Sequence, residues 1–388
     1  MIAMTIEQTA TADNTPSKPP IFHAFGSVIH AASHGARELT HLVAEVHGTI
    51  RQLPLPFNRE FQPHHRHAPF PYRLVAHGFQ LLARMSRTFL PANTEFSHPH
   101  ARRAHAALNG VCGDKLDDWR SPLASPVTLR NADGTLMPLS EWTDPAAKGQ
   151  VLFIHGLCCS ELDWQGSEHL AFVDQLSRKG YRVGWLRYNS GRGIPENGAE
   201  ISAWLDMAFA DTRKKRPLIL IGHSMGGLLI RSACEQAARQ ESTWLKRVTH
   251  AAYLGSPHFG APLERLGNAA NGLLGYTPYT KPFMRLGNIR SQGIRDLRTA
   301  RLTVDETQPP LQPQIEHLFL AGALTEPRLD HVVGDGLVPV YSALAQDHAG
   351  DLLSAPHVHR AFIDKLGHIA MMTDAQTYDV LREWLGVH

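Results

Sequence analysis

Short apolar runs that alternate with helical stretches dominate the chain after about Pro126. The runs are rich in β-branched and aromatic residues and cover 151–155, 181–188, 217–224, 248–257, 317–322 and 359–364. Helical patterns lie between or after these runs, near 167–178, 197–212, 225–239 and 374–386. Uninterrupted apolar strands that alternate with helices are typical of a mostly parallel sheet covered by helices on both faces. We therefore predict an α/β fold for this part of the chain.

The sequence divides further around this predicted sheet. Residues 1–20 are polar and predict a flexible tail, and residues 21–119 carry helical periodicity that predicts an N-terminal helical arm. The sheet domain is then expected to cover 120–388. Within it, residues 259–314 interrupt the alternation, because they combine glycine and proline with scattered large apolar side chains. We interpret this stretch as a cap inserted above the sheet.

The composition excludes two classes of protein. Hydrophobic residues make up 43% of the chain and supply a core, which excludes intrinsic disorder of the whole. The chain has 38 basic and 36 acidic side chains and no basic run, so we do not expect a nucleic-acid partner. Four cysteines in so long a chain are expected to be reduced thiols rather than a disulfide framework; they are Cys112, Cys158, Cys159 and Cys234.

The N-terminal segment has the wrong pattern for export. Residues 1–20 include Glu7 and Asp13 and lack the apolar stretch of about 7–15 residues that a secretory signal needs. The sequence also contains no run of about 18 uncharged apolar residues, so a membrane-spanning helix is not expected. These patterns predict a cytoplasmic location.

The strongest motif is the G-x-S-x-G pentapeptide Gly222-His223-Ser224-Met225-Gly226. It lies between an apolar run, PLILI, and a helical stretch, LLIRSACEQAAR. A serine in so sharp a turn adopts strained backbone geometry, which the flanking glycines tolerate because they have no Cβ to clash. The helix that follows directs its N-terminus at the serine, which favours developing negative charge. We therefore predict that Ser224 is a nucleophile.

Ser224 needs a base, because a serine hydroxyl is a poor nucleophile at neutral pH. In this architecture an acidic residue and then a histidine follow the serine along the chain. His368 lies between the last predicted strand and the last helix, at the carboxyl edge of the sheet, whereas His357 and His359 lie at the other end of that strand. For the acid, Asp335 stands between two glycines that allow a tight turn, and Asp330 lacks that setting. We predict His368 as the base and Asp335 as its partner, with Asp330 as the alternative.

Acyl transfer at Ser224 would also need two N–H donors for the oxyanion. One is expected from Met225, the residue after the nucleophile, and the other from the loop that follows an earlier strand. That loop is His155-Gly156-Leu157, directly after the run VLFIH. We therefore predict the Leu157 N–H as the second donor, with the double cysteine at 158 and 159 filling space under the loop.

Together these motifs resemble those of the α/β-hydrolase lipases and esterases: HGL after a strand, GHSMGG, GSPHFG, GDGLVP and a late GH. Over roughly residues 120–388 the sequence is most similar to the bacterial group related to the GPI inositol-deacylase and triacylglycerol lipase families. The resemblance implies an α/β-hydrolase fold and a triad of Ser224, Asp335 and His368, with Leu157 and Met225 as oxyanion donors. We expect cleavage of a carboxylic ester through an acyl-enzyme, which needs no metal or organic cofactor.

The expected substrate is a small-molecule or lipid ester with a hydrophobic acyl group. The cap carries large apolar side chains and both its ends emerge beside Ser224, so it is predicted to form the acyl pocket with Leu273, Leu274, Phe283 and Met284. A thioesterase, amidase or acyltransferase is an alternative, since the same constellation serves all acyl transfers. A catalytically silent lipid-binding or scaffold protein of the same fold is the second alternative.

The N-terminal arm is rich in histidine. Four histidines, His23, His30, His34 and His41, fall on one face of its first predicted helix. No cysteine or carboxylate completes an obvious tetrahedral set, so we predict a solvated face rather than a metal site. The opposite, apolar face is expected to dock on the sheet domain, with contact to a membrane or lipid surface as the alternative.

Overall fold

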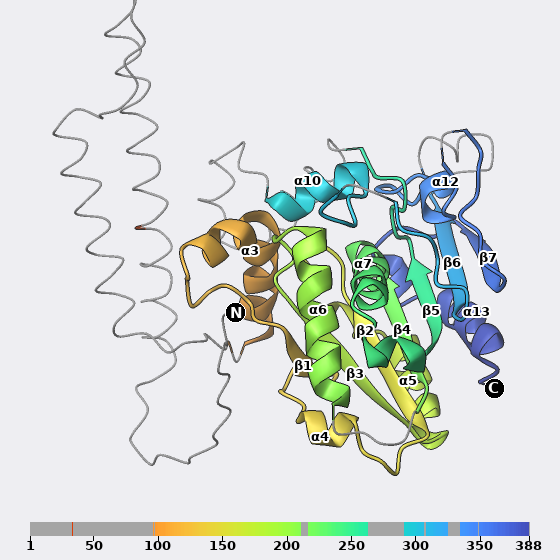
Figure 1. The fold of residues 1–388 in the computed structure, drawn as a ribbon, viewed down its shortest axis with the longest axis horizontal. Coiled ribbons are helices and arrows are strands. Elements are labelled where there is room, and N and C mark those ends of the chain that lie inside the picture. Colours follow the sequence, from red (N-terminus) through yellow and green to blue (C-terminus); the bar gives the residue numbers. More distant parts are fainter. Residues whose placement is uncertain are drawn as a thin grey trace, which may run out of the picture. The chain divides into compact units, whose positions relative to one another are not determined.

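The computed structural model describes residues 98–210, 216–262, 291–305, 308–324, 334–347 and 349–387, together with Ser33 and Phe96. All elements below belong to one compact unit, Glu95–His388 (Figure 1). The predicted tail at 1–20 and the histidine-rich helix of the arm lie outside the described residues.

A seven-stranded sheet forms the centre of this unit, in the order β1-β3-β2-β4-β5-β6-β7. The strand β1 is antiparallel to β3, and every other neighbouring pair is parallel. This confirms the predicted mostly parallel sheet. The strands are β1 (Thr128–Arg130), β2 (Gly149–Ile154), β3 (Tyr181–Arg187), β4 (Leu218–His223), β5 (Val248–Leu254), β6 (Glu316–Ala323) and β7 (Val358–Asp364).

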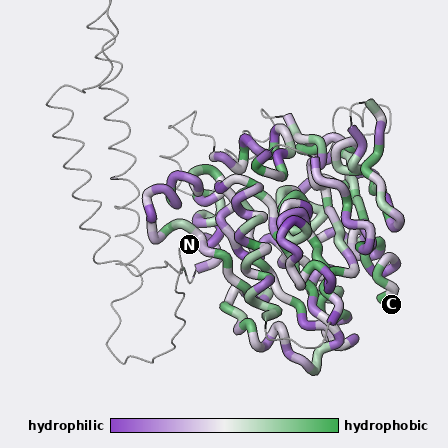
Figure 2. Tube along the Cα trace, in the orientation of Figure 1, coloured by the Kyte–Doolittle hydropathy of each residue, from purple (hydrophilic) through white to green (hydrophobic). Residues whose placement is uncertain are grey.

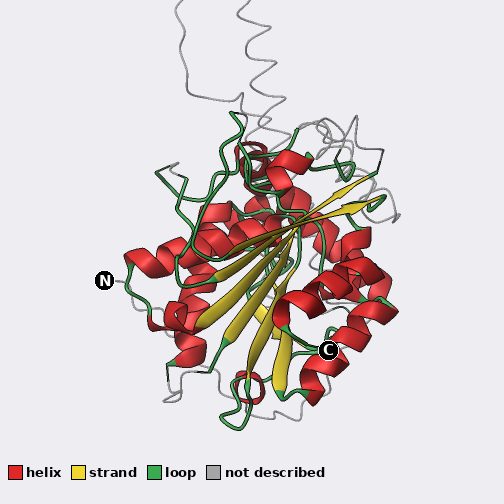
Figure 3. Cartoon of the chain, turned by 90° about the vertical axis from the view of Figure 1, so that its right-hand side faces the viewer, coloured by secondary structure: helices red, strands yellow, loops and turns green. Residues whose placement is uncertain are grey.

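Helices cover both faces of this sheet, as Figure 3 shows. On one face α6 and α7 pack together, and α7 contacts β4 and β5; on the other face α5 and α13 pack together, and they contact β3 and β7. The α-helices are α3 (Pro99–Asp118), α4 (Leu139–Trp142), α5 (Ser167–Arg178), α6 (Ile194–Phe209), α7 (Met225–Arg239), α10 (Gln292–Thr299), α12 (Val340–Ala343) and α13 (Ala375–Leu385). Three 3₁₀ helices, η1 (Glu161–Trp164), η2 (Thr243–Arg247) and η3 (Ala370–Met372), complete the described elements.

The core divides into two layers, one on each face of the sheet. Successive strand residues alternate between the layers, because side chains along a strand point to opposite faces. In β4, Leu218 and Leu220 pack with α6 and α7, whereas Ile219 and Ile221 pack with the side of α5 and α13. The central strands are therefore mostly apolar (Figure 2), as in Leu218–Ile221 of β4, which is why the sequence pattern predicts them.

The order of the strands reverses between β2 and β4. The chain runs from β2 to β3 on one side and then crosses back to β4 on the other side of β2. In open parallel sheets, ligands bind outside the carboxyl ends of the strands where the strand order reverses in this way. The residues that follow β2 and β4 are Leu157 and Ser224, two of the predicted site residues.

The helix α3 belongs to the same compact unit as the sheet. The sequence analysis expects a helix at 101–111 within the arm and a boundary at residue 120, but the compact unit starts at Glu95 and includes all of α3. The helix α3 ends at Asp118, about two turns after the predicted end at Val111. Val111, and Cys112 and Leu116 in this extension, are buried. Among the described residues, no helix is both long and apolar enough to cross a membrane.

The described part of the predicted cap contains α10. The residues directly after β5 are tied to it, since the Ala261 N–H donates to the Leu297 carbonyl at 3.2 Å. The helix α10 also contacts α3 and α6 (Figure 1). The segment 263–290 of the cap lies outside the described residues.

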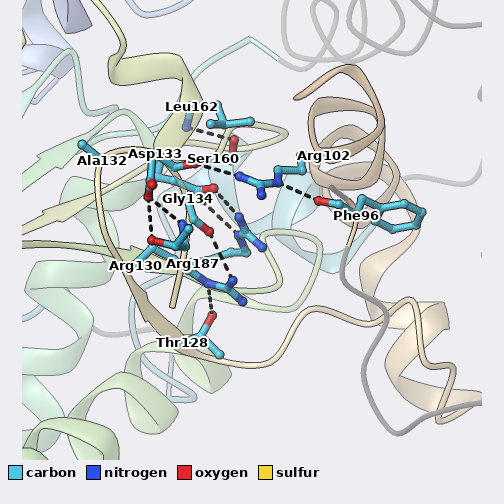
Figure 4. A network of polar contacts seen from close by, with 12 residues as sticks. Phe96, Arg102, Thr128, Arg130, Ala132, Asp133, Gly134, Ser160, Leu162 and Arg187 are labelled. Carbon is cyan, nitrogen blue, oxygen red and sulfur yellow. Dashed lines mark hydrogen bonds and ion pairs between the residues drawn. The ribbon is translucent and has the colours of Figure 1, made fainter. Parts of the chain in front are cut away.

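A network of arginines joins α3 to the β1 edge of the sheet, as Figure 4 shows. Arg102 donates to the carbonyls of Phe96 and Asp133, at 2.6 and 2.8 Å. Beside it, Arg187 at the end of β3 forms an ion pair with Glu161 of η1, with an Nε–Oε2 distance of 3.0 Å. The Glu161 side chain is 0% exposed and that of Arg187 only 11%, so this pair is buried.

Replacement of Arg187 by methionine is expected to lower the free energy of unfolding by about 3–5 kcal/mol, because Glu161 would stay buried without its cation. Urea denaturation measures this. The control is Arg178→Met, which breaks an ion pair with Asp174 whose side chains are 79% and 56% exposed. Exposed pairs contribute about 1 kcal/mol or less. Equal losses in the two variants would contradict the structural role of the buried pair.

Candidate active site

Ser224 lies in a tight turn between β4 and α7. Its backbone angles are φ 54° and ψ −120°, a conformation that costs a residue with a Cβ about 1–3 kcal/mol. The turn is fixed at both ends, since the Ser224 N–H donates to the Leu254 carbonyl at 2.8 Å and the Gly227 N–H donates to the Ser224 carbonyl at 3.1 Å. The serine thus stands at the N-terminus of α7, where the helix dipole favours negative charge.

Two glycines make this turn sterically feasible. A Cβ on Gly222 would lie 2.5 Å from the Gly226 carbonyl carbon, and a Cβ on Gly226 would lie 2.8 Å from the His155 carbonyl oxygen. Both distances are shorter than real Cβ contacts, so larger residues would push the helix away from β2. The spacing in G-x-S-x-G therefore reflects the close packing of β2, β4 and α7.

Asp335 and His368 form a buried pair at the same edge of the sheet. The His368 Nδ1 lies 2.7 Å from Asp335 Oδ2, and the His368 N–H donates to the Asp335 carbonyl at 3.0 Å. The second carboxylate oxygen accepts the N–H groups of Leu337 and Val338, at 3.0 and 2.8 Å. The Asp335 side chain is fully buried, and these three hydrogen bonds satisfy both of its carboxyl oxygens.

The turn that presents Asp335 has the form expected from the glycines around it. Gly334 and Gly336 have φ values of 54° and 98°. The Gly334 carbonyl accepts the Leu324 N–H at 2.9 Å, which ties the turn to the end of β6. Asp330, the alternative acid, lies outside the described residues.

The end of β5 connects Ser224 to this pair. Leu254, whose carbonyl accepts the Ser224 N–H, is followed by Gly255. A Cβ on Gly255 would lie 3.1 Å from Asp335 Oδ2 and 3.3 Å from His368 Nδ1. The backbone of β5 therefore contacts the serine turn on one side and the Asp335–His368 pair on the other.

His223, the residue before the serine, packs directly on His368. Its ring centroid lies 4.7 Å from that of His368, and its Nε2 donates to the His368 carbonyl at 2.9 Å. Burial lowers the pKa of His223 well below its ordinary value, and the neighbouring His368 lowers it further. His223 is therefore neutral at pH 7 and adds no positive charge beside His368.

The loop after β2 is held in place by an aromatic stack. The His155 ring stacks on Tyr188 with centroids 4.3 Å apart, and the Tyr188 hydroxyl donates to the His155 carbonyl at 2.7 Å. His155 Nδ1 lies 2.8 Å from the Gly156 carbonyl, so it donates to the turn itself. Burial lowers the pKa of His155 to about 4, which keeps this ring neutral as well.

The two predicted oxyanion donors come from different elements. Met225, directly after Ser224, is the first residue of α7, and Leu157 lies in the loop after β2. A Cβ on Gly156 in that loop would lie 3.0 Å from Ser224 Cβ, so the loop packs against the serine. Neither backbone N–H donates a hydrogen bond to any of the described residues. Unpaired N–H groups next to a serine are available to a developing oxyanion, which is the property that the predicted role requires.

This arrangement supports nucleophilic acyl transfer. If His368 Nδ1 carries a proton, as its contact with a carboxylate requires, the other ring nitrogen is free to accept a proton. The buried hydrogen bond to Asp335 orients the ring, and the helix N-terminus and two free N–H groups can stabilise negative charge. Such a set of groups matches the roles of nucleophile, base, orienting acid and oxyanion donors.

Several predicted residues cannot be placed in the site. Those predicted to line the acyl pocket lie outside the described residues; they are Leu273, Leu274, Phe283 and Met284. All four cysteines are buried free thiols. Cys158 and Cys159 directly follow His155-Gly156-Leu157, and we call the segment 155–159, which carries the predicted donor Leu157, the oxyanion loop. Within the described ranges, no group of three or more His, Cys, Asp or Glu residues could hold a metal ion.

Sequence reasoning missed three residues that shape the site: His223, Tyr188 and Gly255. The position of His223 inside the pentapeptide and the position of Gly255 in GSPHFG were the available signals. Tyr188 gave no such signal, because its contact with His155 depends on the pairing of β2 with β3.

Comparison with known proteins agrees with the fold. A family model described as the alpha/beta hydrolase family matches residues 151–380, more than half of the chain. No curated protein matches the sequence.

Solved structures resemble the chain at low identity. The mature lipase BlEst2 of Bacillus licheniformis is 17% identical with a TM-score of 0.44, and the match covers 68% of this chain and 100% of that one. Staphylococcus hyicus lipase is 16% identical with a TM-score of 0.39, covering 63% and 95%. The NocB thioesterase domain, in covalent complex with a fluorophosphonate nocardicin G analogue, is 14% identical with a TM-score of 0.39, covering 68% and 100%. At these values the likenesses say nothing about the substrate of this chain.

The Asp335→Asn variant is expected to lose up to about 10⁴-fold in kcat on a p-nitrophenyl ester, because an amide at this position favours the wrong imidazole tautomer. Asp330→Asn is the matched control and should stay within a few-fold of the wild type. Steady-state kinetics of the two purified variants make the comparison. A larger loss at Asp330 would reassign the acid.

Proposed function

The chain belongs to the α/β-hydrolase family, and we propose that it is a serine hydrolase that cleaves carboxylic esters with lipophilic acyl groups. The observation that carries this proposal is the 2.7 Å contact between His368 and Asp335, at the sheet edge where Ser224 occupies its strained turn. A buried carboxylate that orients a histidine beside such a serine is the arrangement that acyl transfer requires.

In the proposed reaction, the Ser224 hydroxyl attacks the ester carbonyl and passes its proton to His368. Asp335 stabilises the resulting imidazolium, while the N–H groups of Leu157 and Met225 stabilise the oxyanion. The tetrahedral intermediate collapses as His368 protonates the leaving alcohol, which leaves an acyl-enzyme. Water, deprotonated by His368, then attacks the acyl group and restores Ser224.

The electrostatics around His368 support its role as the base. His223, whose ring packs on His368, has a pKa well below its ordinary value, and burial lowers the pKa of His155 to about 4, so both rings are neutral at pH 7. An imidazolium on His368 would therefore contact the Asp335 carboxylate and the uncharged ring of His223. A carboxylate on one side and an uncharged ring on the other favour the His368 imidazolium that forms in the transition state.

We also propose that the cap forms the acyl pocket. Its described ends support this, because the Ala261 N–H donates to the Leu297 carbonyl of α10 at 3.2 Å, which joins the two ends of the cap. A Cβ on Gly293, at the start of α10, would lie 3.0 Å from the Met225 side chain. The cap thus contacts a proposed oxyanion residue, and the apolar residues of 273–284 lie between Ala261 and α10 in the sequence.

The Ser224→Ala variant is expected to lose about 10⁴-fold or more in kcat, because the members of a triad act as a unit. The loss should occur without a change in fold, which circular dichroism checks. The assay uses an ester, a thioester and an amide of the same acyl group, so it also separates esterase from thioesterase and amidase activity. Retention of more than a tenth of the activity in the variant would mean that Ser224 is not the nucleophile.

Longer acyl chains are expected to raise kcat/KM by roughly fourfold per CH₂ until the pocket is filled, since each buried CH₂ contributes about 0.8 kcal/mol. The measurement compares acetyl, butyryl, octanoyl and palmitoyl esters in the wild type. Single alanine variants of four cap residues, Leu273, Leu274, Phe283 and Met284, should shift the preferred chain length. If kcat/KM falls from acetyl upward, or if all four variants keep the wild-type profile, the cap does not form the pocket.

A further inference from the structure

The helix α3 contacts the oxyanion loop although it lies outside the residues that the family model matches. We infer that α3 positions this loop for catalysis and that Gly110 is the positioning residue. The inference rests on the proposed function, because it assigns a role in the same reaction. It concerns the region that the sequence analysis assigns to an arm without a chemical role.

Gly110 is in direct contact with Cys158, the residue after the proposed donor Leu157. A Cβ on Gly110 would overlap the Cys158 sulfur and lie 2.7 Å from its amide nitrogen and 2.8 Å from its Cα. Such distances involve backbone atoms, which cannot rotate away as the end of a side chain can. Only glycine at this position allows α3 and the loop to lie so close together.

Cys158 needs such support, because its backbone is strained. Its φ is 62°, in the left-handed region that residues with a Cβ seldom adopt. Strain of this kind persists where the surrounding structure over-determines the conformation. Here the Cys158 N–H donates to Ser190 Oγ at 3.2 Å, and its sulfur lies 3.7 Å from the Ala107 carbonyl of α3. The loop is thus held between α3 and the segment after β3.

The same face of α3 fixes that second segment. Asn189 donates to the Gly113 carbonyl at 2.9 Å, and a Cβ on Gly191 would lie 2.6 Å from the Gly113 amide nitrogen. The position of Ser190, which accepts the Cys158 N–H, therefore depends on α3 as well. The helix α3 therefore contacts Cys158 on one side and fixes the segment that contacts it on the other.

The cap joins α3 at the same place. The Ser291 hydroxyl donates to the Gly110 carbonyl at 2.6 Å, and the Gln292 N–H donates to Asp114 Oδ2 at 3.0 Å. Gly110 thus contacts the oxyanion loop through its Cα and the cap through its carbonyl. A displacement of α3 at this residue would move the Leu157 N–H, and an error of about 1 Å in such a donor can cost roughly 10²-fold in rate.

The test is the Gly110→Ala variant in the full chain, with hydrolysis of p-nitrophenyl butyrate as the assay. We expect kcat to fall at least tenfold while KM stays within threefold, since the donor acts on the oxyanion and not on the bound ester. Hydrogen exchange of the 156–160 segment should rise in the same variant, and this readout does not depend on activity.

The matched control is Gly184→Ala, a buried glycine in β3 whose added Cβ would meet Leu129 at 2.7 Å and Trp142 at 3.3 Å. It should lower stability but leave kcat within twofold. Cys158→Ala is the second variant. It removes the sulfur and adds no atoms, so it tests the same contact without steric overlap if Gly110→Ala does not fold. It is expected to lower kcat several-fold at constant KM and to raise exchange in 156–160.

The outcomes separate the two proposals. If the wild type hydrolyses no ester, thioester or amide, the proposed function fails, and the exchange data alone then test the contact between α3 and the loop. If the wild type is active but kcat in Gly110→Ala stays within twofold, the positioning role is overturned. Equal kcat losses in Gly110→Ala and Gly184→Ala would overturn it too, because they would reflect general destabilisation.

Discussion

The left-handed backbone at Ser224 is the constraint on which the rest of the site depends. A residue with a Cβ adopts φ 54° only if its neighbours hold it there. The Leu254 carbonyl accepts its N–H, and the parallel pairing of β4 with β2 and β5 fixes the strand that precedes it. The free energy that the buried sheet contributes thus stabilises one strained residue whose hydroxyl stands at a helix N-terminus.

Burial controls the charges around this residue. His223 and His155 are kept neutral by desolvation, whereas Asp335 is buried with three hydrogen bonds to its carboxylate. The Asp335 carboxyl group and the uncharged ring of His223 therefore both contact His368. This arrangement suits the proposed role of His368, which gains a proton during the reaction and loses it again.

Local sequence patterns predict the strands, helices and turns whose residues are close together in the sequence. The buried strands, α5 and α7 follow directly from apolar runs and helical periodicity, and α6 begins earlier than expected because Pro195 is tolerated in the first turn of a helix. The glycines around Asp335 indicate its turn for the same reason. The three-residue β1 is too short for any periodicity to identify.

Contacts between distant segments could not be predicted in this way. The packing of α3 on the oxyanion loop joins Gly110 to Cys158, and neither residue carries a pattern that points to the other. The stack of His155 on Tyr188 likewise depends on the strand order. A family-level match that begins at residue 151 also leaves α3 outside its range.

The most direct test of the central claim is covalent trapping of the nucleophile. The wild-type protein is incubated with a fluorophosphonate, digested, and analysed by tandem mass spectrometry. We expect one equivalent of adduct, located on Ser224. An unmodified Ser224 under conditions in which a control serine hydrolase is fully labelled, or an adduct on a different residue, would contradict it.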